Sequence, residues 1–340
     1  MLGRYDGLRF TADPVAYPGV HVTELSVPSP SDTMASVDQV RDALERQCYI
    51  GSSRIATVVY LAFHLRKPIL VEGPPGVGKT ELAKTTARML DLPLIRLQCY
   101  EGLDESKALY EWKYGKQLLY IQVLKEQLDD ALGGARGLKE SVERLHQYGD
   151  IFFSETFLEP RPLLKALREA NGSVLLIDEI DKSDEQFESL LLEMLSDYQV
   201  SIPEIGTIAA AGVPPLVFLT SNNSREVSDA LKRRCLHLYI PYPDAAHERQ
   251  IIQARVPEIT RELRRQLVAF VQALREMDLR KAPAISETID WARTLLLLHI
   301  DALDDDWIRD TLNVLLKFQD DVDSVEAQLP YLTRRVAGAR

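Results

Sequence analysis

The stretch Gly73-Pro74-Pro75-Gly76-Val77-Gly78-Lys79-Thr80 decides the fold of this chain. It fits the pattern G-x-x-x-x-G-K-[ST], in which a glycine-rich loop surrounds phosphates with its backbone N–H groups. The apolar run Pro68–Glu72 precedes the loop and predicts a buried strand, and a helical run begins at Glu81. The start of that helix brings a partial positive charge to the same phosphates. The alternative, a flexible glycine loop, does not explain the flanking strand and helix.

The loop predicts a site for a nucleoside triphosphate. Lys79 should reach the β- and γ-phosphates, and the hydroxyl of Thr80 should bind Mg²⁺. The candidate nucleotide-binding residues of this stretch are Gly73, Pro74, Pro75, Gly76, Val77, Gly78, Lys79, Thr80 and Glu81.

Length and composition bound the rest of the chain. It has 340 residues with a net charge of −11, 46% hydrophobic and 27% charged residues, which predicts an ordinary globular protein of about two domains. No apolar stretch approaches the roughly 18 residues of a membrane span, and no signal peptide is visible, so we expect a cytoplasmic protein without membrane contact. The acidic balance argues against a nucleic-acid partner. The cysteines are too scattered for a disulfide framework or a zinc site, and we expect all three to be buried: Cys48, Cys99 and Cys235.

Alternating strand and helix patterns predict an α/β fold with a parallel sheet covered on both faces. Five apolar runs are the expected strands: Pro68–Glu72, Leu94–Cys99, Ser173–Asp178, Pro215–Ser221 and Leu236–Ile240. Helical patterns such as Glu81–Leu90 and Gln186–Leu195 lie between them.

The two ends of the chain differ from this core. Prolines break any helical period over residues 1–35, which we expect to form an irregular arm. The core is expected over residues 36–243. After Pro241-Tyr242-Pro243 only helical patterns remain, which predicts a helical domain over residues 244–340.

A pair of carboxylates follows the third expected strand. Asp178 and Glu179 lie at its carboxyl end, where α/β sheets bind ligands. We expect Asp178 to hold Mg²⁺ through water, opposite Thr80, and Glu179 to accept a proton from the attacking water. A solvated acidic pair is the alternative, but the phosphate loop favours the catalytic interpretation. The second carboxylate favours ATP hydrolysis over transfer to an acceptor, as in a P-loop kinase.

Further candidate catalytic residues lie between the fourth and the fifth expected strands. Asn222 ends the fourth expected strand, where its amide could orient the attacking water; a turn-forming asparagine is the alternative. Arg233 and Arg234 come just before the fifth strand. Arginine suits the charge of a phosphoryl transition state because its guanidinium donates two parallel hydrogen bonds and stays protonated. A salt-bridged surface pair is the alternative for both.

These motifs together resemble the AAA+ ATPases, in that family's order, over residues 36 to about 320. The chain looks like the MoxR family within AAA+, and specifically its CoxD-like branch. The narrower resemblance rests on five stretches: Leu97-Gln98-Cys99-Tyr100-Glu101-Gly102, Arg161-Pro162-Leu163-Leu164, Asp178-Glu179-Ile180-Asp181, Ile202-Pro203-Glu204-Ile205-Gly206 and Asp229-Ala230-Leu231-Lys232-Arg233-Arg234-Cys235.

The resemblance implies a P-loop αβα sandwich with strand order 5-1-4-3-2 and a C-terminal helical lid. It also implies ATP and Mg²⁺ as cofactors, with ATP bound between subunits of a homo-oligomeric ring, most often a hexamer. Asn222 would then take the sensor-one role, and Arg234 the role of a finger acting on the neighbouring subunit. Tyr49-Ile50-Gly51 looks like the segment that flanks adenine.

Two features depart from the simplest AAA+ pattern. About 100 residues separate Glu72 from Ser173, where two βαβ steps need roughly 60, so we expect an insert over about residues 100–152. A hairpin is also expected over about 198–212. The lid lacks the Ser-Pro-Arg of MoxR-like sequences, since residues 282–286 read Ala-Pro-Ala-Ile-Ser. The nearby cations are Arg280, Lys281 and Arg293, and spacing favours none of them.

The leading functional hypothesis is a ring-forming chaperone or remodelling ATPase. By resemblance to CoxD-like proteins it would mature a metalloenzyme client together with a von Willebrand factor A partner protein. Two alternatives stay open: a nucleic-acid motor or loader, and a slow nucleotide-gated switch. The acidic composition and the absence of a basic stripe with interleaved aromatic residues argue against the motor.

Overall fold

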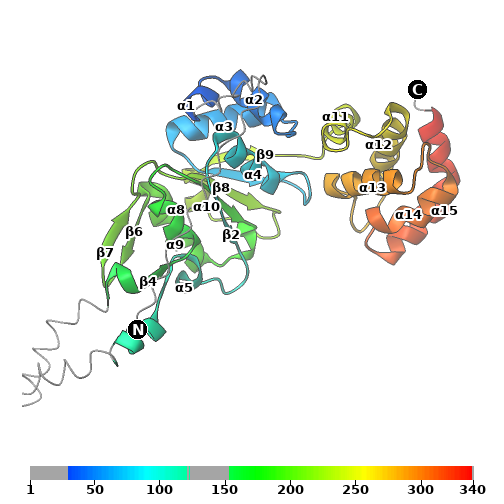
Figure 1. Cartoon of the computed structure of the whole chain (residues 1–340). Coiled ribbons are helices and arrows are strands. Elements are labelled where there is room, and N and C mark those ends of the chain that lie inside the picture. Colours follow the sequence, from blue (N-terminus) through cyan, green and yellow to red (C-terminus); the bar gives the residue numbers. More distant parts are fainter. Residues whose placement is uncertain (1–29, 121, 123–152, 339–340) are drawn as a thin grey trace, which may run out of the picture.

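The computed structural model describes residues 30–120, 122 and 153–338, and its centre is a five-stranded parallel sheet (Figure 1). The strands are β1 (Ile69–Glu72), β2 (Leu94–Gln98), β5 (Val174–Asp178), β8 (Leu216–Ser221) and β9 (Leu236–Tyr239). Their order is β2-β5-β8-β1-β9, which confirms the predicted order 5-1-4-3-2. Each strand lies inside its predicted apolar run and is shorter by one residue. The carboxyl ends of β1, β5 and β8, which carry the candidate site residues, therefore share one edge of the sheet.

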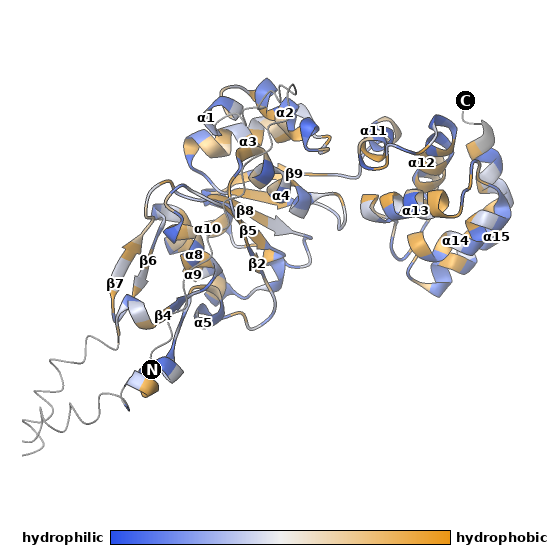
Figure 2. Ribbon diagram, in the orientation of Figure 1, coloured by the Kyte–Doolittle hydropathy of each residue, from blue (hydrophilic) through white to orange (hydrophobic). Residues whose placement is uncertain are grey.

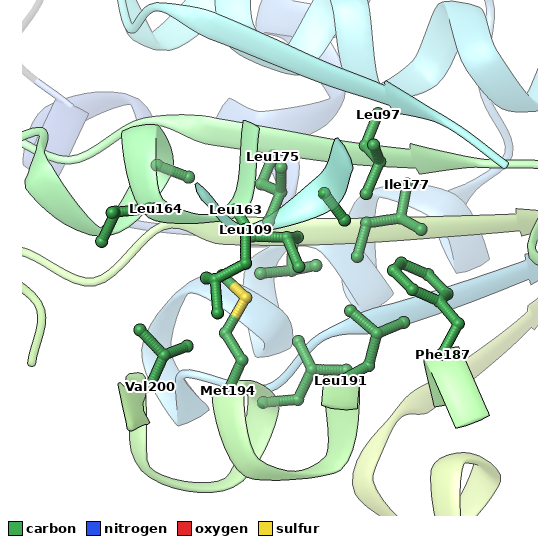
Figure 3. Packing of buried hydrophobic residues seen from close by; sticks show 14 of the residues in the cluster. Leu97, Leu109, Leu163, Leu164, Leu175, Ile177, Phe187, Leu191, Met194 and Val200 are labelled. Atoms are coloured by element: carbon green, nitrogen blue, oxygen red, sulfur yellow. The ribbon is translucent and has the colours of Figure 1, made fainter. Parts of the chain in front are cut away.

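Helices cover both faces of the sheet, so the core has three layers. Alternate strand residues point to opposite faces. Leu175 and Ile177 of β5 pack under α8 (Pro162–Arg168) and α9 (Glu185–Asp197), as Figure 3 shows. Val174 and Leu176 face the other way, toward a second apolar cluster. That cluster is built with helices α2 (Val37–Arg46), α3 (Ser53–Leu65) and α4 (Lys79–Leu90). Apolar colour is concentrated in the strands between these layers (Figure 2).

Two small antiparallel strand pairs and several short elements complete the core. β3 (Tyr110–Trp112) pairs antiparallel with β4 (Leu158–Pro160), and β6 (Gln199–Ile202) pairs antiparallel with β7 (Gly206–Ala209). The short helical elements are α1 (Pro30–Thr33), α5 (Glu105–Ala108), η1 (Glu155–Phe157), η2 (Ile180–Lys182) and α10 (Asp229–Arg234). Much of the expected insert, residue 121 and residues 123–152, lies outside the described residues.

A helical unit follows the extended connector at residues 240–244 and is coloured yellow to red in Figure 1. It consists of α11 (Ala245–Arg255), α12 (Arg261–Arg275), α13 (Ile285–Leu297), α14 (Asp305–Leu315) and α15 (Gln319–Gly338). Its apolar core is separate from those of the sheet and contains the fully buried rings of Phe270 and Trp291. Asp304 caps α14 through a hydrogen bond from the Trp307 N–H, which accounts for the acidic run there.

Two expectations about local structure are wrong. The arm was expected to stay irregular to residue 35, but Pro30–Thr33 form a helical turn and Met34 is fully buried. Proline is tolerated at the start of a helix, and the Met34 carbonyl lies 2.8 Å from Nε2 of His64, which ties this segment to α3. Residues 1–29 lie outside the described part. Cys48 is exposed, because it follows the end of α2 with a left-handed backbone (φ 58°) that turns the chain; Cys99 is buried and Cys235 half-buried.

None of the helices in the described ranges is both long and apolar enough to cross a membrane.

Candidate functional site

The loop between β1 and α4 is held tightly against its neighbours, and two glycines make this possible. Gly73 has φ 148°, and a Cβ atom there would lie 2.1 Å from the Ile240 carbonyl oxygen. Gly76 has φ 72°, and a Cβ atom there would lie 2.4 Å from Cβ of Ala284. Larger residues would strain the backbone and push the loop away from Ile240, just after β9, and from Ala284 in the helical unit. The glycine pattern therefore serves both the loop shape and its contacts.

Lys79, the first residue of α4, is the buried cation of the site. Its Nζ donates hydrogen bonds of 2.7 Å to the carbonyl oxygens of Gly73 and Pro74 and to Oδ1 of Asn222. Burial lowers the pKa of Lys79 from 10.5 to about 8, against the opposing effect of Asp181 and the neighbouring carboxylates. The structure thus brings together the loop lysine and the amide at the end of β8.

Thr80, at the start of α4, and Asp178, at the end of β5, are in hydrogen-bond contact. Oγ1 of Thr80 donates to Oδ1 of Asp178 at 3.0 Å, and the hydroxyl of Thr220 donates to the same oxygen at 2.5 Å. Asp178 is almost fully buried at the end of β5. A hydroxyl and a carboxylate in contact fit Mg²⁺, which usually takes one or two protein oxygens together with substrate phosphates and water. Within the described residues, no cluster of three or more His, Cys, Asp or Glu side chains exists that would hold a metal without a nucleotide.

Glu179 lies beside Asn222 and directly follows β5. Its backbone has φ 59°, and its N–H donates to Oγ1 of Thr220 at 2.9 Å. Oε1 faces Nδ2 of Asn222 at 3.4 Å, while Oε2 accepts from Gln98 at 2.9 Å and from Lys182 at 2.6 Å. Asn222 connects this carboxylate to the phosphate loop, because it also accepts a hydrogen bond from Lys79. The Glu179 side chain is 30% exposed, so water can reach it. This is a suitable position for a general base.

Two residues of β2 belong to this cleft and were not singled out as site residues from the sequence. Arg96 contacts Asp178, with Nη2 at 2.6 Å from Oδ2 and Nε at 3.1 Å. Gln98 contacts Glu179. Both lie two residues apart on a strand, so they point to the same face. Two polar side chains in that spacing at the carboxyl end of a predicted strand were the available signal.

A cavity of about 580 Å³ opens beside the loop, between the core and the helical unit. Its walls include Tyr49 and Ile50 from the core, Tyr242 from the connector, and Ile251 and Ile289 from the helical unit. These side chains form mostly apolar walls, which suits a flat heterocyclic base. Gly51 does not line the cavity itself but packs against the Tyr49 ring.

Polar contacts join the two sides of this cavity. Nε2 of His247 on α11 lies 2.9 Å from the Ile50 carbonyl oxygen. Nη1 of Arg255 on the same helix lies 3.3 Å from Oε1 of Glu81, which is one of the candidate nucleotide-binding residues. The helical unit therefore forms part of the cavity wall, and its position relative to the core decides the shape of the cavity.

The two arginines before β9 lie away from this cleft. Arg234 donates through Nε to Oγ of Ser196 at 2.7 Å and through Nη1 to the Ala230 carbonyl oxygen at 3.0 Å. Arg233 is exposed and, among the residues that the structure describes, has no hydrogen-bond or ion-pair partner. The structure does not bring either guanidinium to the phosphate loop of the same chain.

The three cations considered for the lid are placed differently. Arg280 stacks on Phe318, with 4.0 Å from its guanidinium carbon to the ring centroid. Arg293 is exposed and lies 3.7 Å from Asp290. Lys281 lies 3.1 Å from Oε1 of Glu287, whose other oxygen would be 3.7 Å from a Cβ atom at Gly76. Of the three, Lys281 is the one whose carboxylate partner adjoins the phosphate loop.

Comparison with known proteins gives one family and several distant relatives. The model of the ATPase family associated with various cellular activities (AAA) matches residues 69–242, just over half of the chain. An uncharacterized protein of Staphylococcus aureus strain bovine RF122 / ET3-1 is 29% identical over 241 residues, covering 69% of this chain and 77% of that protein. An uncharacterized protein of Staphylococcus aureus strain NCTC 8325 is 28% identical over 241 residues, covering 69% of this chain and 77% of that protein.

Solved structures similar to this chain include two of one bacterial protein. The Thermotoga maritima RuvB Holliday junction branch migration motor has a TM-score of 0.43 and 17% identity, covering 82% of this chain and 72% of that chain. A single-residue variant of the same motor has a TM-score of 0.46 and 18% identity, covering 84% of this chain and 77% of that chain.

Proposed function

Since this chain belongs to the AAA family of ATPases, we propose that it binds ATP with Mg²⁺ and hydrolyses it to ADP and phosphate. One observation carries the proposal. Asn222 contacts both Lys79, in the phosphate loop, and Glu179, at the end of β5, so that a cation, an orienting amide and a base share one cleft. Hydrolysis needs these three groups around one phosphate and its attacking water.

Each residue then has a specific task. Lys79 would bind the β- and γ-phosphates, for which it must give up at least one of its three present acceptors. Glu179 would accept the proton of the attacking water, and Asn222 would hold that water in line with the γ-phosphate. Thr80 and Asp178 would hold Mg²⁺, which supplies positive charge to the phosphate oxygens when bound. Tyr49 and Ile50 would contact the base.

We further propose that the active unit is a ring, most simply a hexamer. Arg234 is exposed on α10 and points its guanidinium at α9 rather than at the loop of its own chain. An arginine finger in this position would act on the site of a neighbouring copy. Arg233 would then make a contact at the same interface.

For the biological role, we propose a MoxR-type chaperone or remodelling factor that matures a metalloenzyme client. The support is the resemblance of the five stretches quoted above to CoxD-like proteins, which also implies a von Willebrand factor A partner. The net charge of −11 supports a protein client over a nucleic acid, because phosphate binding is driven by basic surfaces.

Phosphate release by the purified chain tests the enzymatic part. We expect Mg²⁺-dependent turnover that Lys79→Ala abolishes by weakening nucleotide binding. Lys84→Ala is the matched control, since it removes a lysine from the same helix α4, five residues beyond Lys79. Wild-type protein that binds no ATP, or a Lys79→Ala variant with unchanged affinity, would exclude the loop as the site.

The biological part needs a trapped complex. A Glu179→Gln protein in the presence of ATP should retain a metalloenzyme client together with a von Willebrand factor A partner protein. The Lys79→Ala protein should retain neither. DNA that stimulates turnover at physiological salt would favour the nucleic-acid motor instead. Turnover that stays very slow with the partner present would favour the nucleotide-gated switch.

A further inference from the structure

Arg96 on the edge strand β2 lies directly on the carboxylate expected to hold magnesium. Strand β2 pairs with β5 in a register that sets Gln98 beside Asp178 and Arg96 beside Leu176. Two guanidinium nitrogens of Arg96 reach Oδ2 of Asp178, at 2.6 and 3.1 Å. The Asp178 side chain is 4% exposed, whereas that of Arg96 is 48% exposed. The pair therefore joins a fixed buried anion to a cation that is half in solvent.

The same guanidinium also reaches the second carboxylate through Gln98. Nη2 of Arg96 donates to Oε1 of Gln98 at 2.7 Å, which orients the amide so that Nε2 donates to Oε2 of Glu179 at 2.9 Å. One side chain thus holds both acidic residues of the site, Asp178 directly and Glu179 through one amide.

The oxygens of Asp178 have few free positions left. Oδ1 accepts from Thr80 and Thr220, and Oδ2 accepts from Arg96, with a longer contact of 3.3 Å to Thr80. A divalent cation or its water must take one of these positions. A guanidinium and Mg²⁺ on one carboxylate would repel each other, and the burial of Asp178 makes this repulsion larger than it would be in bulk water.

We propose that Arg96 is an internal counter-cation of Asp178 that competes with Mg²⁺ for this carboxylate, so that Arg96 makes nucleotide binding less dependent on metal. This inference rests on the proposed function. Without metal, Arg96 neutralises a carboxylate that would otherwise repel the phosphates of ATP. With metal, release of Arg96 from Asp178 opposes binding, and the exposed half of its side chain gives it a route into solvent. Release also withdraws the hydrogen bond that orients Gln98 against Glu179.

The test compares ATP dissociation constants in EDTA and in Mg²⁺ for the wild type and Arg96→Met, measured by calorimetry without turnover. Methionine keeps an unbranched chain and removes the charge. We expect affinity in EDTA to fall in the variant, and affinity in Mg²⁺ to stay or rise. The ratio of the two constants should grow on the order of tenfold, within the usual range for coupled binding events. The midpoint of a Mg²⁺ titration at fixed ATP should fall accordingly.

Three controls keep the inference falsifiable. Arg309→Met removes an exposed arginine paired with Asp306 on α14 and should leave the ratio unchanged. Arg96→Lys keeps a charge without the two-pronged contact and should fall between wild type and Arg96→Met. In an Asp178→Asn background, removal of Arg96 should no longer change the ratio, because the carboxylate that couples them is gone. Thermal unfolding curves establish that each variant is folded.

Equal changes of affinity in EDTA and Mg²⁺, or no change in either, would overturn the counter-cation role while leaving ATP binding intact. An unaltered effect of Arg96→Met in the Asp178→Asn background would also overturn it. Absence of ATP binding by the wild type would instead be a failure of the proposed function, so the two failures are distinguishable.

Discussion

The side-chain oxygen of Asn222 accepts a hydrogen bond from Nζ of Lys79 at 2.7 Å, across 143 residues of sequence. All three described acceptors of this ammonium group are oxygens of the protein: the carbonyls of Gly73 and Pro74, and Asn222. A γ-phosphate that binds Lys79 must therefore replace at least one of them. If it replaces Asn222, the amide is released toward Glu179, which its nitrogen already faces at 3.4 Å. Nucleotide arrival and alignment of the base are thereby connected.

This arrangement predicts that Glu179→Gln separates binding from chemistry. The variant should keep its ATP affinity, because Lys79, Thr80 and Asp178 remain, and lose turnover by about 10²–10⁴-fold, the usual contribution of a general base. Phosphate release and a fluorescent-nucleotide titration measure the two quantities. Glu258→Gln, an exposed residue of the helical unit, is the matched control. A parallel loss of affinity would assign Glu179 to the magnesium site instead.

A second prediction concerns pH. Because burial lowers the pKa of Lys79 to about 8, the ammonium of the nucleotide-free protein loses its proton as pH rises above that value. Affinity for ATP in EDTA should then fall from about pH 7.5 to 9.5, by at most roughly tenfold per pH unit for one titrating group. Lys79→Arg should flatten this profile, since the guanidinium stays charged. A steep profile in Lys79→Arg would show that another group titrates.

The lowered pKa of Lys79 affects the folding stability of the nucleotide-free protein in the opposite direction: stability rises with pH where ATP affinity falls. The pKa of Lys79 is lower in the folded state than its ordinary value of 10.5, so the unfolded chain binds more protons between about 8 and 10.5. The contribution of Lys79 to stability therefore rises with pH across that window and is smallest below it.

Local patterns in the sequence predicted the sheet well because its three central strands, β1, β5 and β8, are buried on both faces. Runs such as 174–178 are continuously apolar and end in polar residues, and such strands can hardly be placed elsewhere. The convergence of Lys79, Thr80, Asp178, Glu179 and Asn222 followed from the same reasoning, since parallel strands bring their carboxyl ends to one edge.

Features that depend on distant contacts could not be predicted in this way. The role of Arg96 requires the register of β2 against β5, which no local pattern encodes. The burial of Met34 depends on its place in the apolar cluster that it shares with residues of α3 and α4. The exposure of Cys48 has a local cause, the left-handed turn after α2, which its sequence pattern did not indicate. Glu287, the carboxylate partner of Lys281, adjoins the loop because the start of α13 packs against Gly76, a contact across more than 200 residues of sequence.

A third prediction concerns the stability of the helical unit. Glu248 is fully buried and accepts two hydrogen bonds of 2.8 Å from Arg275, together with bonds from Gln272 and Thr288. Arg275 also donates to the Pro283 carbonyl oxygen just before α13. Removing the arginine leaves a buried charge without its partner, so Arg275→Met should lower the free energy of unfolding by about 3–5 kcal/mol.

Urea denaturation followed by circular dichroism measures this loss. Arg293→Met is the control, because its pair with Asp290 is exposed on both sides and should contribute less than about 1 kcal/mol. Replacing both buried partners, Glu248→Leu with Arg275→Met, should recover part of the loss, since no unpaired charge remains. An Arg275→Met variant as stable as the control would mean that the pair is not part of the folded core.

The last prediction concerns Arg234 and needs the ring. If Arg234 serves a neighbouring site, one subunit supplies the phosphate loop, Asp178 and Glu179, and the next supplies the guanidinium. An arginine finger contributes roughly 10³–10⁵-fold to the rate, so isolated subunits should be nearly inactive. Specific activity should rise with protein concentration as rings assemble. Arg234→Ala should lose turnover but keep ATP binding, because the loop of each subunit is intact.

A mixing experiment separates this arrangement from its alternatives. Combined with Glu179→Gln, the Arg234→Ala protein should regain partial activity, since some interfaces then join an intact Glu179 to an intact Arg234. Arg233→Ala should have the smaller effect, because we propose that Arg233 makes a contact at the subunit interface and does not bind a phosphate. If Arg234 serves only its hydrogen bonds to Ser196 and the Ala230 carbonyl, the mixture will be as inactive as its parts. Activity independent of concentration, without rescue in the mixture, would rule out the finger acting between subunits.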